Sequence, residues 1–143
     1  MRLLPFFLFF ILVQATGSAG FAQCKSLKNM KEEFRNVIKP YDFEGISAGI
    51  LNAGKTRSIS VSVFSRVKYR LNFRTEGFDS PVIIKVVTVN RQVLWSNEKD
   101  TEASVFEFIP HKTDKYFVEF SAPGSSDEDA RGCVAVVLSS RPY

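Results

Sequence analysis

The side chains that most often perform catalysis are scarce in this chain of 143 residues. Its single histidine, His111, lies in "IPHKTD", a segment whose composition is typical of a turn. One histidine excludes a zinc centre of three histidines, and a histidine in a turn is usually solvated. The sequence also has no Gly-x-Ser-x-Gly nucleophile motif, phosphate-binding loop or dinucleotide fingerprint. We therefore predict no catalytic residues; an enzyme would need a carboxylate pair or a Lys–Ser arrangement that no motif marks.

Three adjacent acids, Asp127, Glu128 and Asp129, supply the oxygen ligands that Ca²⁺ prefers. They lack the spaced pattern of an EF-hand loop, and their segment "APGSSDEDAR" is rich in turn formers. Because a run of acids usually forms a solvated loop, we expect neither a metal nor another cofactor. Calcium at these three acids is the weaker alternative.

Basic residues form the most prominent candidate surface. In "RVKYRLNFR", cations alternate with apolar residues, so a strand would place them on one polar face. Such a face can bind an anionic glycan through guanidinium–oxyanion hydrogen bonds. Alternatively, exposed Lys and Arg only keep a sheet soluble and hinder edge pairing, and we favour this second interpretation. The candidate binding residues on this face are Arg66, Lys68, Arg70 and Arg74.

Aromatic residues occupy alternating positions in several segments, as the core of a sandwich requires. Trp95, in "VLWS", would be a sugar-stacking platform if it were exposed beside the basic face. Its apolar neighbours indicate partial burial, which would remove the main support for glycan binding.

The N-terminus predicts export. Arg2 precedes an apolar run from Leu3 to Val13, which is the layout of a signal peptide and too short for a membrane span of roughly 20 residues. Small residues at Gly20 and Ala22 permit cleavage before Gln23, and another pair permits it before Gly20. Loss of residues 1–22 removes Arg2 and lowers the formal net charge from +4 to +3. A charge this mild does not indicate nucleic-acid binding.

The two cysteines, Cys24 and Cys133, can form one intramolecular pair. Because an exported chain meets an oxidising environment, we predict that disulfide. Lipidation of Cys24 is disfavoured, since Gln23 precedes it where a small residue is needed. A lipid-anchored structural envelope protein remains an alternative.

Periodicity divides the rest of the chain into a helix and a β domain. In residues 23–40, Leu27, Met30, Phe34 and Val37 are spaced by three or four, as on one face of a helix that ends at Pro40. From residue 41 to 143 the apolar period is two, in about eight short segments separated by turn signals. The expected fold is all-β: an eight-stranded antiparallel jelly-roll-like sandwich with one N-terminal amphipathic helix.

Several of these segments together resemble a known family. "GILNAGKTRSISVSVFSRVKYRLNF", "VIIKVVTVNRQVLWSN" and "TDKYFVEF" are similar to strands of the bacterial pre-peptidase C-terminal (PPC-like) domain, with Tyr116 at its tyrosine position. The resemblance covers residues 41–138, although Asp114 and Lys115 replace a glycine usual in the family. It implies a jelly-roll-like sandwich that accompanies secreted enzymes and is not itself catalytic, as in small exported proteins of Bacteroidota-type bacteria.

These observations predict an exported, non-catalytic binding or accessory protein, periplasmic or extracellular, without a transmembrane segment in the mature chain. Its expected partner is an envelope protein or an anionic glycan. The alternative function is a secreted hydrolase with an unrecognised carboxylate or Lys/Ser site.

Overall fold

A computed structural model describes residues 29–143; the predicted signal peptide and Cys24 lie outside this range. One helix precedes eight strands, as expected from the change of apolar period. The elements are α2 (Met30–Val37), β1 (Asp42–Asn52), β2 (Thr56–Val63), β3 (Val67–Glu76), β4 (Ile83–Val87), β5 (Val93–Ser96), β6 (Val105–Phe108), β7 (Asp114–Ser121) and β8 (Arg131–Pro142).

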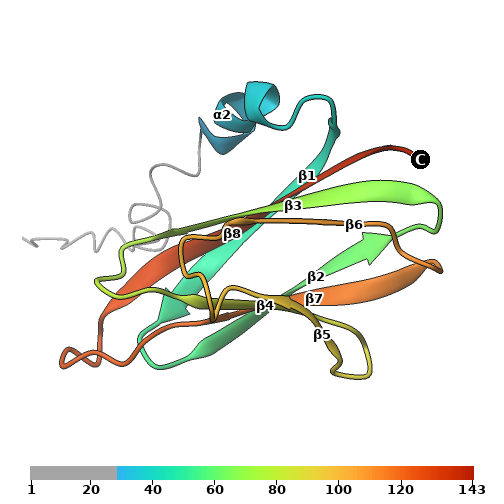
Figure 1. Ribbon diagram of the computed structural model, residues 1–143. Coiled ribbons are helices and arrows are strands. Elements are labelled where there is room, and N and C mark those ends of the chain that lie inside the picture. Colours follow the sequence, from blue (N-terminus) through green and yellow to red (C-terminus); the bar gives the residue numbers. More distant parts are fainter. Residues whose placement is uncertain (1–28) are drawn as a thin grey trace, which may run out of the picture.

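The strands form two antiparallel four-stranded sheets that stack as the layers of a sandwich (Figure 1). One sheet has the order β1-β8-β3-β6 and the other has the order β2-β7-β4-β5. Most consecutive strands therefore lie in different sheets, as in a jelly roll. The predicted fold class is confirmed.

Alternation along each strand builds the core between the sheets. Leu71 and Phe73 of β3 face Val118 and Phe120 of β7 in one buried cluster. The intervening side chains point to the outer faces, because successive residues of a strand alternate. Burying this many apolar side chains is the main source of stability for such a domain.

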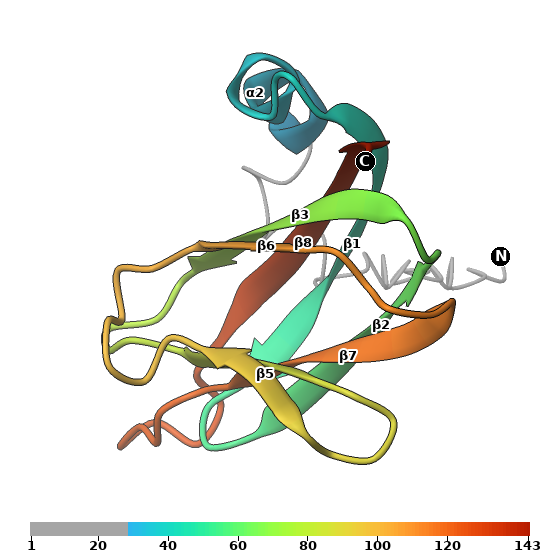
Figure 2. The ribbon, with the colours of Figure 1, turned by 45° about the vertical axis from the view of Figure 1, so that its right-hand side comes forward.

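Strand β8 is apolar on both faces because both faces are covered. Val134 and Val136 belong to the core between the sheets, whereas Ala135 and Val137 pack outside against Met30 of α2. Figure 2 shows α2 on the outer side of the sheet that contains β1, β8 and β3. The helix thus covers the domain's own sheet.

Within the described residues the helix differs from its prediction at Val37, and the predicted apolar residue Leu27 lies outside them. Met30 is buried and Phe34 packs beside it, but Val37 is 61% exposed and the buried residue at this end is Ile38. Met30, Phe34 and Ile38 are spaced by four, so the buried stripe continues to the C-cap residue Ile38 and leaves Val37 on the solvent side. Among residues 29–143, no helix has the length and apolar character required to cross a membrane.

Candidate functional site

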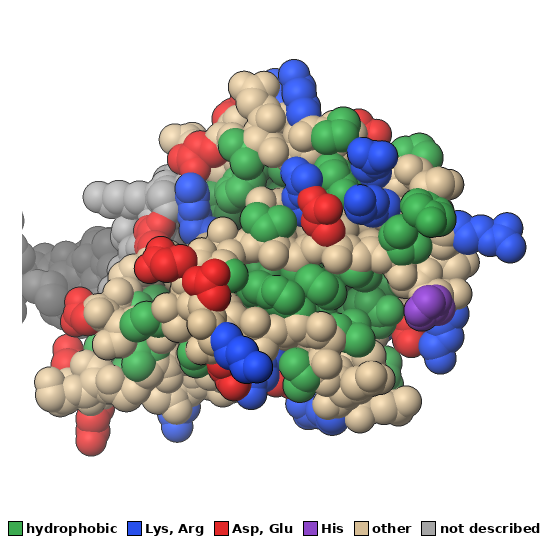
Figure 3. Space-filling view, viewed as in Figure 1, with side chains coloured by type: hydrophobic (Ala, Val, Ile, Leu, Met, Phe, Trp, Pro, Cys, Tyr) green, Lys and Arg blue, Asp and Glu red, His purple; other side chains and the backbone are tan. Residues whose placement is uncertain are grey.

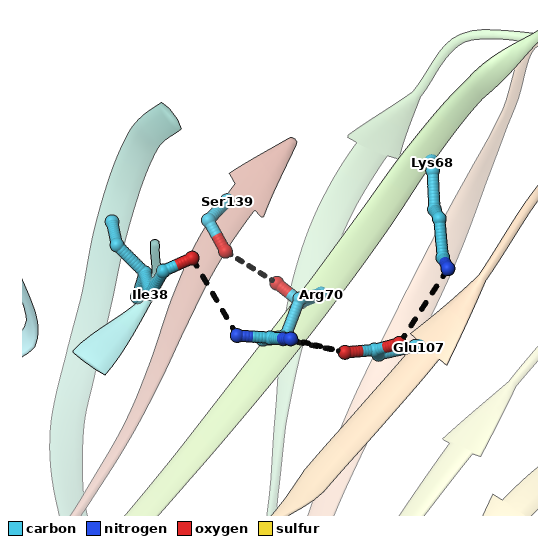
Figure 4. Close-up of polar contacts among 5 residues, drawn as sticks. All are labelled: Ile38, Lys68, Arg70, Glu107 and Ser139. Atoms are coloured by element: carbon cyan, nitrogen blue, oxygen red, sulfur yellow. Dashed lines mark hydrogen bonds and ion pairs between the residues drawn. The ribbon is translucent and has the colours of Figure 1, made fainter. Parts of the chain in front are cut away.

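The predicted basic face lies on the outer side of β3, where its cations are engaged by residues of the same chain. Glu107 of β6 lies directly opposite Arg70 in the antiparallel register. Nε of Arg70 donates to Oε1 of Glu107 at 2.7 Å, and Nζ of Lys68 lies 3.7 Å from Oε2 (Figure 4). One carboxylate therefore compensates two of the predicted anion-binding residues.

The other contacts of these arginines hold the helical region on the sheet. Arg70 donates to the backbone oxygen of Ile38 at 3.5 Å, and its guanidinium lies 4.2 Å from the ring centroid of Tyr41. Arg74 pairs with Glu33 of α2 and lies over the ring of Phe34. Arg70 and Arg74 are thus structural contacts of α2 and of the segment that follows it.

The hydrogen bond from Arg70 lowers the pKa of the Glu107 carboxyl below its ordinary value of 4.5, against an opposing effect of desolvation. The positive charges of Arg70 and Lys68 add to the lowering. A carboxyl whose pKa is lower in the folded state stabilises the protein above its unfolded pKa, and that contribution is lost as the pH falls through the folded pKa.

We therefore expect Glu107→Gln to reduce the free energy of unfolding at neutral pH by up to about 1 kcal/mol, because the ion pairs are partly solvated. The difference from wild type should shrink as the pH falls below about 4. Urea unfolding at several pH values measures this. Glu102→Gln is the control, since Glu102 has no ion pair within residues 29–143; an equal pH profile for both variants would contradict the assignment.

Trp95 is half-buried and packs against the core of the sandwich. Its ring stacks on Phe73 at a centroid distance of 5.1 Å and on Phe106 at 5.9 Å, and Phe106 stacks on Phe108 at 5.1 Å. Figure 3 shows hydrophobic side chains gathered along the seam between the sheets on the side of β6. The aromatic row seals this seam, so Trp95 is not a free stacking platform beside the basic face.

The remaining predicted site residues do not converge. His111 is exposed in the β6–β7 connection, and the acids Asp127, Glu128 and Asp129 lie in the β7–β8 loop. Oδ1 of Asp127 accepts a hydrogen bond from the backbone N–H of Asp129 at 3.0 Å, as in an ordinary turn. No group of three metal-ligating side chains was found in residues 29–143.

Cys133 lies in β8 and is only 1% exposed. Its predicted partner, Cys24, falls outside the described residues, so the disulfide stays a prediction.

A groove opens between β1 and β2. The two strands are joined by a short turn at residues 53–55 but belong to different sheets, so each is an edge strand. At the wide end is a hollow of about 560 Å³. It adjoins one of about 280 Å³ along the seam, and Glu44, Ser62 and Leu138 line both. The wide end is also lined by Asp42, Phe64, Arg66, Tyr69, Ser140 and Arg141.

A three-residue turn, Phe64 to Arg66, forms one wall of the wide end. The backbone N–H of Phe64 donates to the hydroxyl of Tyr69 at 2.9 Å, which fixes the turn, while the Phe64 side chain remains 61% exposed. Arg66 has φ of 63°, a left-handed conformation that non-glycine residues rarely adopt. A bulky aromatic ring and a strained arginine thus stand together beside the groove.

The charges at the wide end are not compensated as those of the basic face are. Arg66 and Asp42 form no ion pair with any residue in the range 29–143, and Arg141 has only the ring of Tyr41, at 5.7 Å. The carboxylate of Glu44 accepts a hydrogen bond from the hydroxyl of Ser140. These side chains leave hydrogen-bonding capacity for a ligand.

The structure thus separates the predicted binding residues. Lys68, Arg70 and Arg74 share the paired face, whereas Arg66 lies in the turn and lines the groove. Sequence reasoning missed Phe64, although it follows Ser58, Ser60 and Ser62 in the polar phase of the alternation. A phenylalanine at a position where the alternation predicts an exposed polar residue could have indicated an exposed aromatic side chain.

No protein-family profile matches the chain, and no curated protein matches it. The resemblance to the PPC-like domain therefore stays a prediction. Among solved structures, the chain is similar to PliG of Aeromonas hydrophila, described as a periplasmic lysozyme inhibitor of g-type lysozyme, at 10% identity and a TM-score of 0.49. The match covers 69% of this chain and 87% of that one.

Proposed function

We propose that this protein is an exported, non-catalytic binding protein that engages a partner protein at the wide end of the groove between β1 and β2. Export follows from the signal-peptide pattern of the first 22 residues. The observation that carries the proposal is the conjunction of an exposed Phe64 with uncompensated charges on Arg66 and Asp42.

Aromatic and arginine side chains dominate the binding energy of protein interfaces when they are buried by the partner. Phe64 offers a large apolar surface, and Arg66 offers five hydrogen-bond donors in a fixed planar group. Asp42 provides a charge of the opposite sign at the same rim. A partner surface with matching charges around an apolar contact would fit this end of the groove.

The basic face supports the alternative of an anionic glycan less well. Its three cations already bind Glu107 and Glu33, so a glycan would have to displace those carboxylates or α2 itself. Binding there would gain little net electrostatic energy.

Arg66→Gly is the sharpest test, because glycine accepts the backbone conformation that strains Arg66. We expect its free energy of unfolding to stay within about 1 kcal/mol of wild type, since relief of strain offsets the lost side chain. Its affinity for the partner should fall about tenfold or more. The measurement is immunoprecipitation of the full-length exported protein from the cell envelope, with mass spectrometry of the co-purified proteins.

Arg91→Gly is the matched control. Arg91 also has a positive φ, of 67°, but it sits in the β4–β5 turn and pairs with Glu119. A partner kept by wild type and Arg91→Gly and lost from Arg66→Gly would support the proposal. Equal retention by Arg66→Gly would contradict it, as would loss on charge reversal of Lys68, Arg70 and Arg74 alone.

A further inference from the structure

The two lateral seams of the sandwich are closed to different degrees. On one side, Trp95, Phe106 and Phe108 stack across the seam between the sheets. On the other, the seam lies between the edge strands β1 and β2 and contains the hollow of about 280 Å³. An edge of this kind exposes backbone N–H and C=O groups to any chain that can lie beside it.

Small residues of β1 leave this hollow open. Ser47 pairs with Val136, a core residue, so both side chains point to the inner face of the sheet. At Gly45, an added Cβ would meet no atom within 4 Å. The floor of the hollow is formed by the apolar side chains of Val61, Val136 and Leu138, and its exposed rim is polar, formed by Glu44, Ser47, Ser60 and Ser62. It therefore suits an apolar side chain that β1 itself does not supply.

The narrow end of the seam is already filled. An added Cβ at Gly49 would lie 2.2 Å from Nε of Arg57, so the guanidinium occupies the space that this glycine leaves. Nη1 of Arg57 donates to the backbone oxygen of Ile50 at 3.2 Å. A side chain from β2 thus already binds the β1 edge here. The open part of β1 lies on the N-terminal side of Gly49, in residues 45–48.

The open part of β1, residues 45–48, contains no charged side chain and no proline. Natural edges are guarded by such residues or by bulges, and the register of β1 shifts only before this part, between Phe43 and Gly45. The charges of β1, Asp42 and Glu44, stand at the wide end of the groove. An incoming strand would meet uncharged side chains along residues 45–48, and only Ile46 among them is large.

We propose that an extended segment of a partner protein adds to the free edge of β1 as a fifth strand of that sheet and inserts a large apolar side chain into the hollow beside Ser47. This inference rests on the proposed function and specifies how the partner protein binds. The exposed backbone groups require an extended peptide, and the apolar floor selects its side chain.

A second copy of this chain fits less well. If two β1 edges paired, each would present its own Gly45, Ser47 and Gly49 to the inner face. Those side chains are too small to fill a hollow of about 280 Å³. A partner segment with Val or Leu at alternate positions fills it without loss of backbone hydrogen bonds.

The first experiment uses the end-blocked peptide Lys-Thr-Val-Thr-Leu-Thr-Val-Thr-Lys as a probe of the full-length exported protein. We expect calorimetric binding and slower amide hydrogen exchange in residues 45–49. Replacing the central Leu by Ser should weaken binding about tenfold or more, since the hollow then stays unfilled. N-methylation of the amides of both valines, the leucine and the threonines between them should abolish binding, because it removes the strand's donors whichever alternate set faces β1.

Variants of the protein separate filling of the hollow from mere contact with β1. Ser47→Phe should abolish peptide binding and keep or raise Tm, because the ring occupies the hollow. Ala48→Phe is the control on the adjacent residue: Ala48 pairs with Ala135, which lies on the outer face, so peptide binding should persist. Gly45→Leu is a second filling variant, should Ser47→Phe fail to fold.

Three results would overturn strand addition. They are no binding of the peptide by wild type at millimolar concentration, binding by both filling variants that is as tight as that of wild type, and unchanged amide exchange in residues 45–49 when the peptide is added. A wild-type dimer that Ser47→Phe dissociates would assign the edge to a second copy instead. If a partner is lost from Arg66→Gly but kept by Ser47→Phe, the proposed function stands and strand addition fails. If the peptide binds as expected while Arg66→Gly keeps the partner, strand addition stands and the proposed role of the wide end of the groove fails.

Discussion

Replacing Phe120 with alanine is expected to lower the free energy of unfolding by about 3–5 kcal/mol, the usual cost of deleting a buried aromatic ring. Phe120 of β7 is fully buried, and its ring meets that of Phe73 of β3 edge to face at a centroid distance of 6.3 Å. The contact joins the two sheets, so alanine would leave a cavity at the centre of the sandwich. Thermal unfolding should show a fall in Tm of more than about 10 °C.

Phe64→Ala is the matched control for this variant. It deletes the same ring from a position that is 61% exposed, where a change of stability within about 0.5 kcal/mol is expected. Because Phe64 also belongs to the proposed binding surface, this variant should lose partner binding with its stability intact. Comparable losses of Tm in the two variants would show that Phe120 does not lie in the packed core.

Replacing Asn97 with alanine is expected to cost about 3 kcal/mol, because it leaves buried backbone groups of Val82 and Ile84 without their partners. Asn97 is 2% exposed and follows β5. Its Oδ1 accepts from the backbone N–H of Ile84 at 2.7 Å, and its Nδ2 donates to the backbone oxygen of Val82 at 3.0 Å. The side chain thus continues the hydrogen bonding of the sheet beyond the end of β5.

Asn72→Ala is the comparison at similar burial. Asn72 is 5% exposed, but its Oδ1 has no hydrogen-bond partner within residues 29–143. Its replacement removes a polar atom that is already unsatisfied, so the loss of stability should be clearly smaller than at Asn97. Urea unfolding of both variants decides the matter; equal losses would mean that the bonds of Asn97 contribute nothing beyond packing.

The two asparagines illustrate a limit of sequence reasoning. Asn72 lies between two apolar residues and Asn97 lies in the polar segment after β5, so the sequence would place Asn97 at the surface, although it is the asparagine that completes a sheet. The difference depends on which backbone groups lie opposite the side chain, and strand order sets that. A similar limit applies to Trp95, whose stacking on Phe106 requires β5 and β6 to face each other across the seam.

The sequence by itself determined the fold class, the number of strands and the polar face of most strands. This was possible because the alternation of side chains is a property of each strand and needs no knowledge of its neighbours. Alternation in β2 and β3 was enough to predict a core between two sheets. Burial of both faces of β8 was not predicted, because it depends on the packing of α2 on its outer face.

Only the tertiary structure decided which side chains meet. Arg70 and Glu107 are 37 residues apart in the chain, and their pairing follows from the order β8-β3-β6. That pairing and the contact of Arg74 with Glu33 turned a predicted binding face into the support of α2. Arg66, predicted to share that face, lies instead at the groove that arises because β1 and β2 enter different sheets. Electrostatic compensation and groove shape depend on distances between strands, which the apolar period of a single strand does not contain.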